Sequence, residues 1–194
     1  MISLRLIIGL SGLCWAMPTP AADLTFNGAC DASAAVFVGP DRLAVADDEN
    51  DDIRVYAPTG GDPIVPPVSL EAQLNQDDAK NEADLEGAGE LDGRIFWIGS
   101  HARNSDGEPQ PNRQRMLITN GDLTAAGAPG RELLPAIIAA DKQWNLGLTA
   151  AIGDQGATVP GLAAEKAGLN IEGIAILPPD GSPSGQAIGL VGLR

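Results

Sequence analysis

The chain has 194 residues, 26 of them acidic and 12 basic, so its formal net charge is −14. This acidity argues against nucleic-acid partners and against anionic membrane surfaces, because both require a basic face on the protein. Glycine (24 residues) and proline (15 residues) are too frequent for a helical bundle and are typical of a turn-rich β protein. The length suits one domain, or part of a larger one.

The first 22 residues have the order of a secretory signal peptide. Arg5 supplies a positive charge, an apolar run follows from Leu6 to Trp15, and small residues and prolines end the segment. An apolar helix of about ten residues spans only about half of a bilayer core, so no permanent membrane span is expected. We predict a signal peptide at 1–22 and a periplasmic or secreted domain at 23–194. The alternative is a short buried N-terminal helix.

Short apolar segments separated by Gly, Pro and Asp turns follow along the chain, and several alternate apolar with polar residues as half-buried strands do. A helix is expected near 131–144, where Leu134, Ile138 and Trp144 lie near one face, and a shorter helical turn near 162–167. The pattern predicts an all-β fold of short antiparallel sheets with these helical insertions. The expected strands cover residues 34–38, 42–46, 53–56, 93–99, 115–119, 171–176 and 186–191.

Three segments repeat one order of features: small residues, a strand, an Asp-centred turn and a returning strand. They begin near Asp31, Leu85 and Ile171. Repeated β units at spacings of tens of residues are typical of β-propellers. Three units cannot close a ring of about four to eight blades. The sequence therefore predicts a partial, truncated propeller-like arrangement, and the alternative is a small sandwich whose turns look alike by chance.

Acidic residues concentrate in the first half of the chain, and the densest run is residues 47–52. Oxygen ligands at loop spacing suit Ca²⁺, so Asp47 and Asp48 are candidate ligands. The alternative is a solvated turn between two strands, which is what most charge runs are.

A second acidic group is Asp84 with Glu86, which would point to the same side of a strand. Like charges this close repel each other unless a cation or a proton lies between them. Glu172 repeats the Glu-Gly pair of Glu86, so Asp84, Glu86 and Glu172 form a second candidate metal site. The alternative is that the glutamates cap backbone amides of a neighbouring blade.

The segment after residue 93 is rich in arginine and holds the only histidine. His101 is the candidate catalytic base because the pKa of histidine lies near neutrality; the alternative is a hydrogen-bonded structural residue. Arg103, Arg113 and Arg115 could bind a phosphate or carboxylate with paired N–H groups. They could equally tie their loop to acids of the first half.

The chain resembles the domain of unknown function 3616 family over nearly all of residues 26–194. The resemblance is carried by the segments Cys30–Ala35, Ala46–Asn50, Arg54–Tyr56, Asp84–Gly87, Phe96–His101 and Leu169–Gly173, and by the final Gly-Leu-Arg. That family is similar to phytase-like and esterase-like propellers, which implies metal binding at the Glu-Gly positions. Its members usually continue beyond this Gly-Leu-Arg, which implies C-terminal truncation. No established reaction comes with the family.

Three functional hypotheses follow. The first is an exported propeller-like protein that binds a small polar or anionic ligand, with Ca²⁺-assisted ester or phosphoester hydrolysis as its enzymatic form. The second is a non-catalytic binding or scaffold propeller. The third is a non-functional truncated remnant. No pattern in the sequence indicates an oligomeric state.

Overall fold

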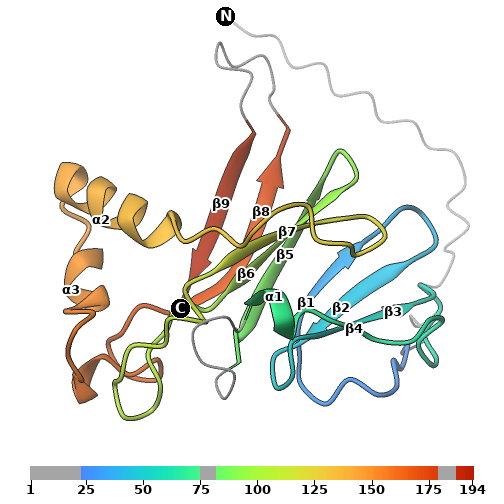
Figure 1. Ribbon diagram of the computed structural model, residues 1–194, viewed down its shortest axis with the longest axis horizontal. Helices are drawn as coiled ribbons and strands as arrows, with labels where there is room; N and C mark the ends of the chain where they lie inside the picture. The colour runs from blue at the N-terminus through green and yellow to red at the C-terminus, as the bar shows by residue number, and fades with distance from the viewer. Residues whose placement is uncertain (1–22, 75–81, 179–186) are drawn as a thin grey trace, which may run out of the picture.

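The computed structural model describes residues 23–74, 82–178 and 187–194. The predicted signal peptide therefore lies outside the described residues. Within these ranges the chain folds into three antiparallel sheets and a few short helices (Figure 1). None of the described helices has the length and apolarity that crossing a bilayer requires.

The first sheet has the order β1-β2-β3-β4, the second β5-β6-β7, and the third pairs β8 with β9. A two-residue turn with positive φ at Asp92 (53°) and Gly93 (76°) joins β5 to β6, as tight hairpins require. The strands are β1 (Ala32–Phe37), β2 (Leu43–Asp47), β3 (Asp52–Tyr56), β4 (Val68–Ser69), β5 (Leu85–Leu91), β6 (Arg94–Gly99), β7 (Met116–Asn120), β8 (Ile171–Leu177) and β9 (Ile188–Leu193).

The helices are α1 (Glu71–Leu74), α2 (Leu133–Trp144) and α3 (Leu148–Ile152). The helix expected near 131–144 is confirmed as α2. The turn expected at 162–167 is displaced: a 3₁₀ turn, η1, covers Pro160–Leu162 and non-helical turns follow it. Pro160 can only begin such a turn, and Gly161 disfavours its continuation as an α-helix.

The all-β prediction is confirmed, and each of the seven expected strands exists with ends shifted by at most two residues. Two strands were missed, β4 and β5. In β5, Gly87 and Gly89 interrupt the apolar pattern, and Glu86 and Glu90 make the segment look polar. The described residues form no closed barrel or propeller ring, so the propeller remains a prediction.

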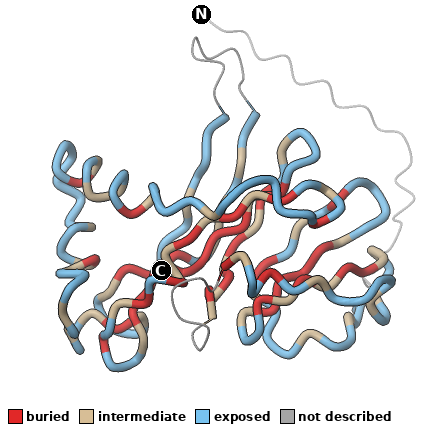
Figure 2. The backbone as a smooth tube through the Cα atoms, in the orientation of Figure 1, coloured by how far each residue is buried: buried red, intermediate tan, exposed pale blue. Residues whose placement is uncertain are grey.

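The main hydrophobic core lies between the first and second sheets (red in Figure 2). Trp97 of β6 is fully buried at its centre, and its Nε1 donates a hydrogen bond of 3.0 Å to Thr119 Oγ1. The core also contains Ala34, Val38, Ala44, Ala46, Ile53, Val55, Leu70, Leu74, Ala83, Leu85, Ile95, Leu117 and Leu123.

The second and third sheets meet in a different way, with backbone close to backbone. A Cβ on Gly87 would lie 2.7 Å from Ile174 N, and one on Gly89 would lie 2.8 Å from Ile176 Cγ1. Only glycine allows β5 to approach β8 this closely. The first strands of the three sheets, β1, β5 and β8, thus pack in succession, and we call them the inner strands.

Each inner strand carries a β-bulge at its beginning. The register shifts lie between Ala32 and Ala34, between Leu85 and Gly87, and between Ile171 and Gly173. The repeat read from the sequence corresponds to the hairpins that these strands open. Ser33, Glu86 and Glu172 consequently occupy equivalent bulge positions.

Candidate acidic cation site

A cleft of about 450 Å³ lies where the inner strands begin. The bulges aim their side chains into it, and bulges are a common device for re-aiming a side chain beside a functional site. The lining residues come from all three sheets and from the loops that follow them. They are Asp31, Ala32, Ser33, Asp48, Asp84, Glu86, Arg113, Ala164, Asn170, Glu172 and Arg194.

Three half-buried carboxylates form the centre of the cleft: Asp48, Asp84 and Glu86 offer oxygens that all lie within 4.8 Å of one another. Asp48 follows β2, Asp84 immediately precedes β5, and Glu86 is the second residue of β5. Asp84 has a positive φ of 54°, which aspartate tolerates better than most residues, and its carbonyl accepts a 2.8 Å hydrogen bond from Ser100 N. This acidic triad could bind a metal ion.

The triad strongly perturbs its own ionisation. Burial, followed by the charges of Asp84, Glu172 and Asp48, raises the pKa of Glu86 to about 7. Burial, followed by the charges of Asp31 and Asp84, raises the pKa of Asp48 to about 6. The folded protein therefore favours a proton, or a cation in its place, between these oxygens.

Two arginines flank the triad. Arg113 pairs through Nη2 with Glu82 Oε1 at 2.6 Å and through Nη1 with Asp84 Oδ2 at 2.7 Å. Arg194 lies 3.2 Å from Oε1 of Glu172, which also accepts a 2.7 Å hydrogen bond from Asn170 Nδ2. Glu172, a predicted metal ligand, therefore lies in the cleft but is held by Arg194 and Asn170 and does not belong to the triad.

Asp47, the other predicted ligand of the acidic run, lies outside the cleft lining. Its side chain is fully buried and pairs with Arg54 Nη1 at 2.9 Å, and it accepts a 3.1 Å hydrogen bond from Cys30 N. Successive residues at a strand end point in opposite directions, which separates Asp47 from Asp48. The acidic run thus contributes one residue to the cleft and one to the first sheet.

Arg103 and Arg115 lie away from the cleft and are buried. The Arg103 guanidinium donates to the carbonyl oxygens of Gly107, Ile152, Asp154 and Ala157 at 2.6–3.3 Å. This side chain ties the loop after β6 to the end of α3 and contacts none of the described acids of the first half to which the alternative assigned it. Burial lowers the pKa of Arg115.

His101 is 4% exposed and does not line the cleft. Its Nδ1 lies 2.9 Å from the carbonyl oxygen of Gly99, and burial lowers its pKa. Of the four cationic or basic site candidates after residue 93, the structure brings only Arg113 to the acids of the cleft. The sequence analysis missed Arg194 and Ser33, although an alignment of the three repeats would have placed Ser33 at the position equivalent to Glu86.

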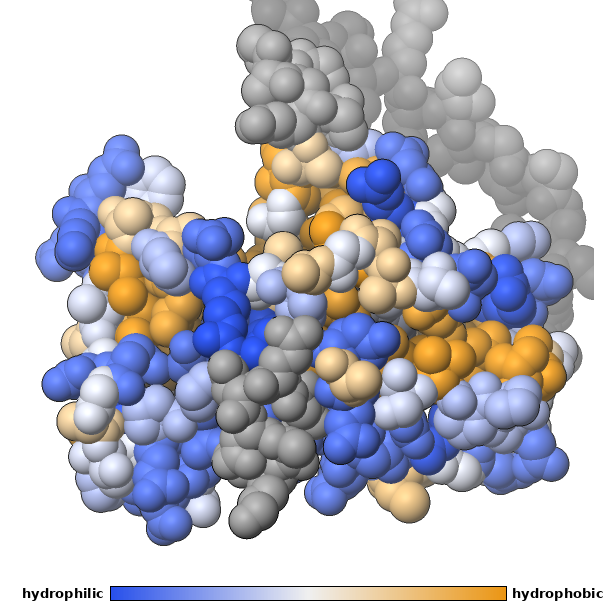
Figure 3. Space-filling view, in the orientation of Figure 1, coloured by the Kyte–Doolittle hydropathy of each residue, from blue (hydrophilic) through white to orange (hydrophobic). Residues whose placement is uncertain are grey.

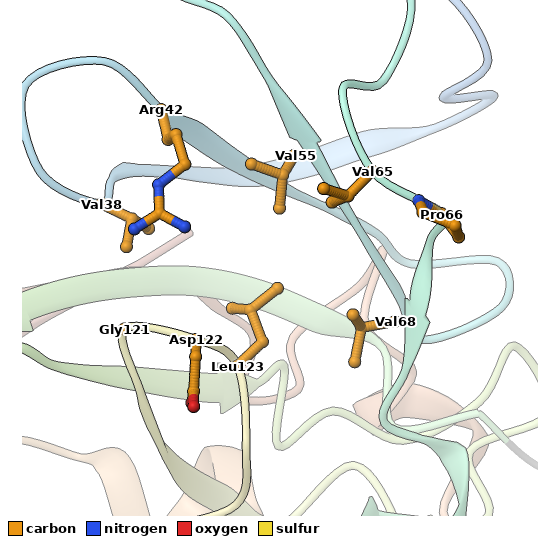
Figure 4. A pocket seen from close by; sticks show the side chains of 9 residues that line it. All are labelled: Val38, Arg42, Val55, Val65, Pro66, Val68, Gly121, Asp122 and Leu123. Atoms are coloured by element: carbon orange, nitrogen blue, oxygen red, sulfur yellow. The ribbon is translucent and has the colours of Figure 1, made fainter.

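Two further cavities lie between the sheets. A groove of about 290 Å³ separates the first sheet from the loop after β7, with valines and Leu123 as its walls and with Arg42 and Asp122 at its margin (Figure 4). A cavity of about 250 Å³ lies between the second and third sheets. Neither gathers predicted site residues, so the acidic cleft is the candidate site.

No model of a known protein family matches the chain, and no curated protein is significantly similar to it. The family resemblance read from the motifs therefore stays a prediction.

Proposed function

We propose that the chain is an exported, propeller-like protein that binds a small anionic ligand through a divalent cation, with Ca²⁺ as the expected ion. The observation that carries this proposal is the acidic triad of Asp48, Asp84 and Glu86, whose oxygens lie within 4.8 Å of one another. Carboxylates on a partly rigid loop-and-strand frame are the ligands that Ca²⁺ prefers. The resemblance to phytase-like propellers supports the same cation.

The residues around the triad suit an anionic ligand better than a neutral one. Arg113 and Arg194 bring two guanidinium groups to the cleft, and both face its acids. A bound cation would offset the negative charge of the triad, so that the cleft with its two arginines would attract an anionic group. Asp84 would then hold the cation and, through its other contact, orient Arg113.

In the enzymatic form of this proposal, the cation would polarise a phosphoryl or ester oxygen and lower the pKa of a bound water. Glu86 is the group in the cleft best suited to accept a proton, since the pKa of its carboxyl is about 7. His101 does not line the cleft, which removes the base that the sequence suggested. That position favours ligand binding without hydrolysis as the second candidate function.

Export to the periplasm or beyond is part of the proposal and depends on the leader sequence at 1–22. Extracellular and periplasmic fluids hold more Ca²⁺ than the cytoplasm does, and weak calcium modules are tuned to such levels. The proposed location and the proposed ion therefore agree.

Calorimetric titration of the purified protein with Ca²⁺, Mg²⁺ and Mn²⁺ tests the cation site. We expect saturable binding of Ca²⁺ and a rise in Tm with Ca²⁺ concentration, because the ion binds the folded state alone. Glu86→Gln and Asp48→Asn should each weaken binding at least tenfold, whereas the exposed Asp106→Asn should bind as the parent does. Absence of both heat and Tm shift at millimolar cation rejects the site.

A panel of phosphoesters and carboxylic esters, assayed with and without Ca²⁺, separates the two forms of the function. Turnover that requires Ca²⁺ and is lost in Glu86→Gln supports the hydrolase. Binding of inorganic phosphate that requires Ca²⁺ and weakens in Arg113→Gln, with no turnover, supports the binding protein. Turnover that persists in chelator and in Glu86→Gln argues against both.

A further inference from the structure

Neighbouring sheets contact each other through equivalent positions of their inner strands, and this arrangement occurs twice within the chain. Ala34 and Val36 of β1 face the second sheet, where Ala34 is part of the core and Val36 packs against it. Gly87 and Gly89 occupy the equivalent positions of β5 and face the third sheet. In both cases, the side of the inner strand that faces the next sheet carries small or apolar residues at the first and third positions after the bulge residue.

The third sheet presents an equivalent surface, which the described residues leave open. Counting from the bulge, the onward-facing positions of β8 are Gly173 and Ala175, and a Cβ on Gly173 would meet no atom within 4 Å. Leu177, Ile188 and Leu190 extend this side of the hairpin and are 43%, 45% and 54% exposed. We call this surface the rear face; apolar surface of the third sheet is visible in Figure 3 next to the grey residues.

The opposite side of the first sheet is the complementary surface. The backward-facing positions of β8 are Ile174 and Ile176, which pack against the second sheet. Their equivalents in β1 are Ala35 and Phe37, which are exposed, Phe37 at 58%. We call the surface of these two residues the front face.

We propose that two copies of the chain pair head to tail, with the rear face of each copy packed on the front face of the other. Each such contact would repeat, between copies, the sheet-to-sheet packing that occurs twice within one chain. The named residues of both faces are uncharged. Two identical contacts related by a two-fold axis close on themselves, which doubles the buried area and removes the open ends.

The pairing would also complete the acidic cleft. Within the chain, adjacent inner strands bring their bulge residues together: the Ser33 hydroxyl donates to the Leu85 carbonyl oxygen, and Glu172 adds to the charges that raise the pKa of Glu86. In the pair, Glu172 of one copy would lie beside Ser33 and Asp31 of the other. This inference stands apart from the proposed cation function, because it depends on apolar packing alone.

Sedimentation velocity and light scattering on the purified protein, at about physiological salt, test the pairing. We expect a species with the mass of two chains that dissociates on dilution. Leu190→Lys on the rear face and Phe37→Lys on the front face should each shift the protein to a folded monomer. The matched control is Leu146→Lys, since Leu146 is 58% exposed and belongs to the link between α2 and α3, not to either face.

Mixing the two face variants distinguishes a head-to-tail contact from a symmetric one. A Leu190→Lys copy retains its front face and a Phe37→Lys copy retains its rear face, so the mixture can form one intact contact. With a different label on each variant, we expect pairs that contain both labels, whereas each variant by itself stays monomeric. A monomeric parent, a dimer that survives Leu190→Lys, an open-ended polymer or a mixture without pairs would each overturn the proposal.

Discussion

The two contacts between neighbouring sheets are built by opposite means. Between the first and second sheets, large side chains such as Trp97, Leu85 and Leu117 fill the space and are fully buried. Between the second and third sheets, Gly87 and Gly89 remove side chains so that β5 can lie against the backbone of β8. The first contact depends on large side chains and the second on the lack of side chains. Substitution by a smaller residue should therefore weaken the first contact, and substitution by a larger residue should weaken the second.

Trp97→Ala should have the largest effect of the changes considered. Loss of a fully buried tryptophan leaves a cavity and removes the partner of Thr119 Oγ1, which costs about 3–5 kcal/mol of unfolding free energy. Urea unfolding measures this change. Trp144→Ala is the matched control: Trp144 is 63% exposed, so its loss should cost under about 0.5 kcal/mol. Equal costs for the two variants would contradict a core centred on Trp97.

Gly87→Ala tests the second contact by adding a single methyl group. Its Cβ would lie 2.7 Å from Ile174 N, so β8 must move away at a cost of about 1–3 kcal/mol. Hydrogen exchange should then show lost protection in β8 and β9, while the first sheet keeps its protection.

The control for Gly87→Ala is the equivalent glycine of the third sheet. Gly173→Ala meets no atom within 4 Å, so the monomer should keep its stability within about 0.5 kcal/mol. At concentrations where the chain pairs, the same methyl group should weaken the pair. If Gly87→Ala leaves the exchange of β8 unchanged, the close approach of the two strands is wrong.

The difference between the contacts explains what the sequence could predict. Apolar alternation marks strands such as β2, β3 and β6 because their side chains fill a core. The same rule missed β5, because Gly87 and Gly89 add no apolar side chain to the pattern; they allow the backbone of β5 to approach β8 closely. A pattern of hydrophobicity does not record how close two backbones lie.

The candidate site was predicted in part for a related reason. The repeat of Glu86-Gly87 and Glu172-Gly173 grouped the two glutamates as candidate ligands, and the structure places both in the cleft. Arg103 and Arg113 have similar sequence surroundings, yet one binds backbone carbonyls and the other two carboxylates. Only the path of the loop between β6 and β7 separates these roles, and composition does not encode that path.

Both sheet contacts border the acidic cleft, to which the third sheet contributes Glu172. Ionisation of the triad should therefore change the stability of the fold in a pH-dependent way, which substitutions of Trp97 or Gly87 do not. The pKa of Glu86 is about 7 in the folded protein against its usual 4.5, so the folded state holds the proton more tightly than the unfolded chain. The stability that this proton contributes is complete below about pH 4.5 and is lost as the pH rises through 7. Asp48, with a pKa of about 6, acts in the same direction.

Glu86→Gln isolates this effect, since glutamine resembles the protonated acid. In chelator, we expect the variant to gain about 1–2 kcal/mol over the parent between pH 5 and pH 8; solvent at this half-exposed carboxyl reduces the full effect of the shift. His101, whose pKa is lowered by burial, changes stability in the opposite direction near pH 6.5, so the measured quantity is the difference between variant and parent. The exposed Glu165→Gln should show no such difference. A gain that is absent, or that grows toward low pH, would mean that the triad carries its charges without strain and has no need of a cation.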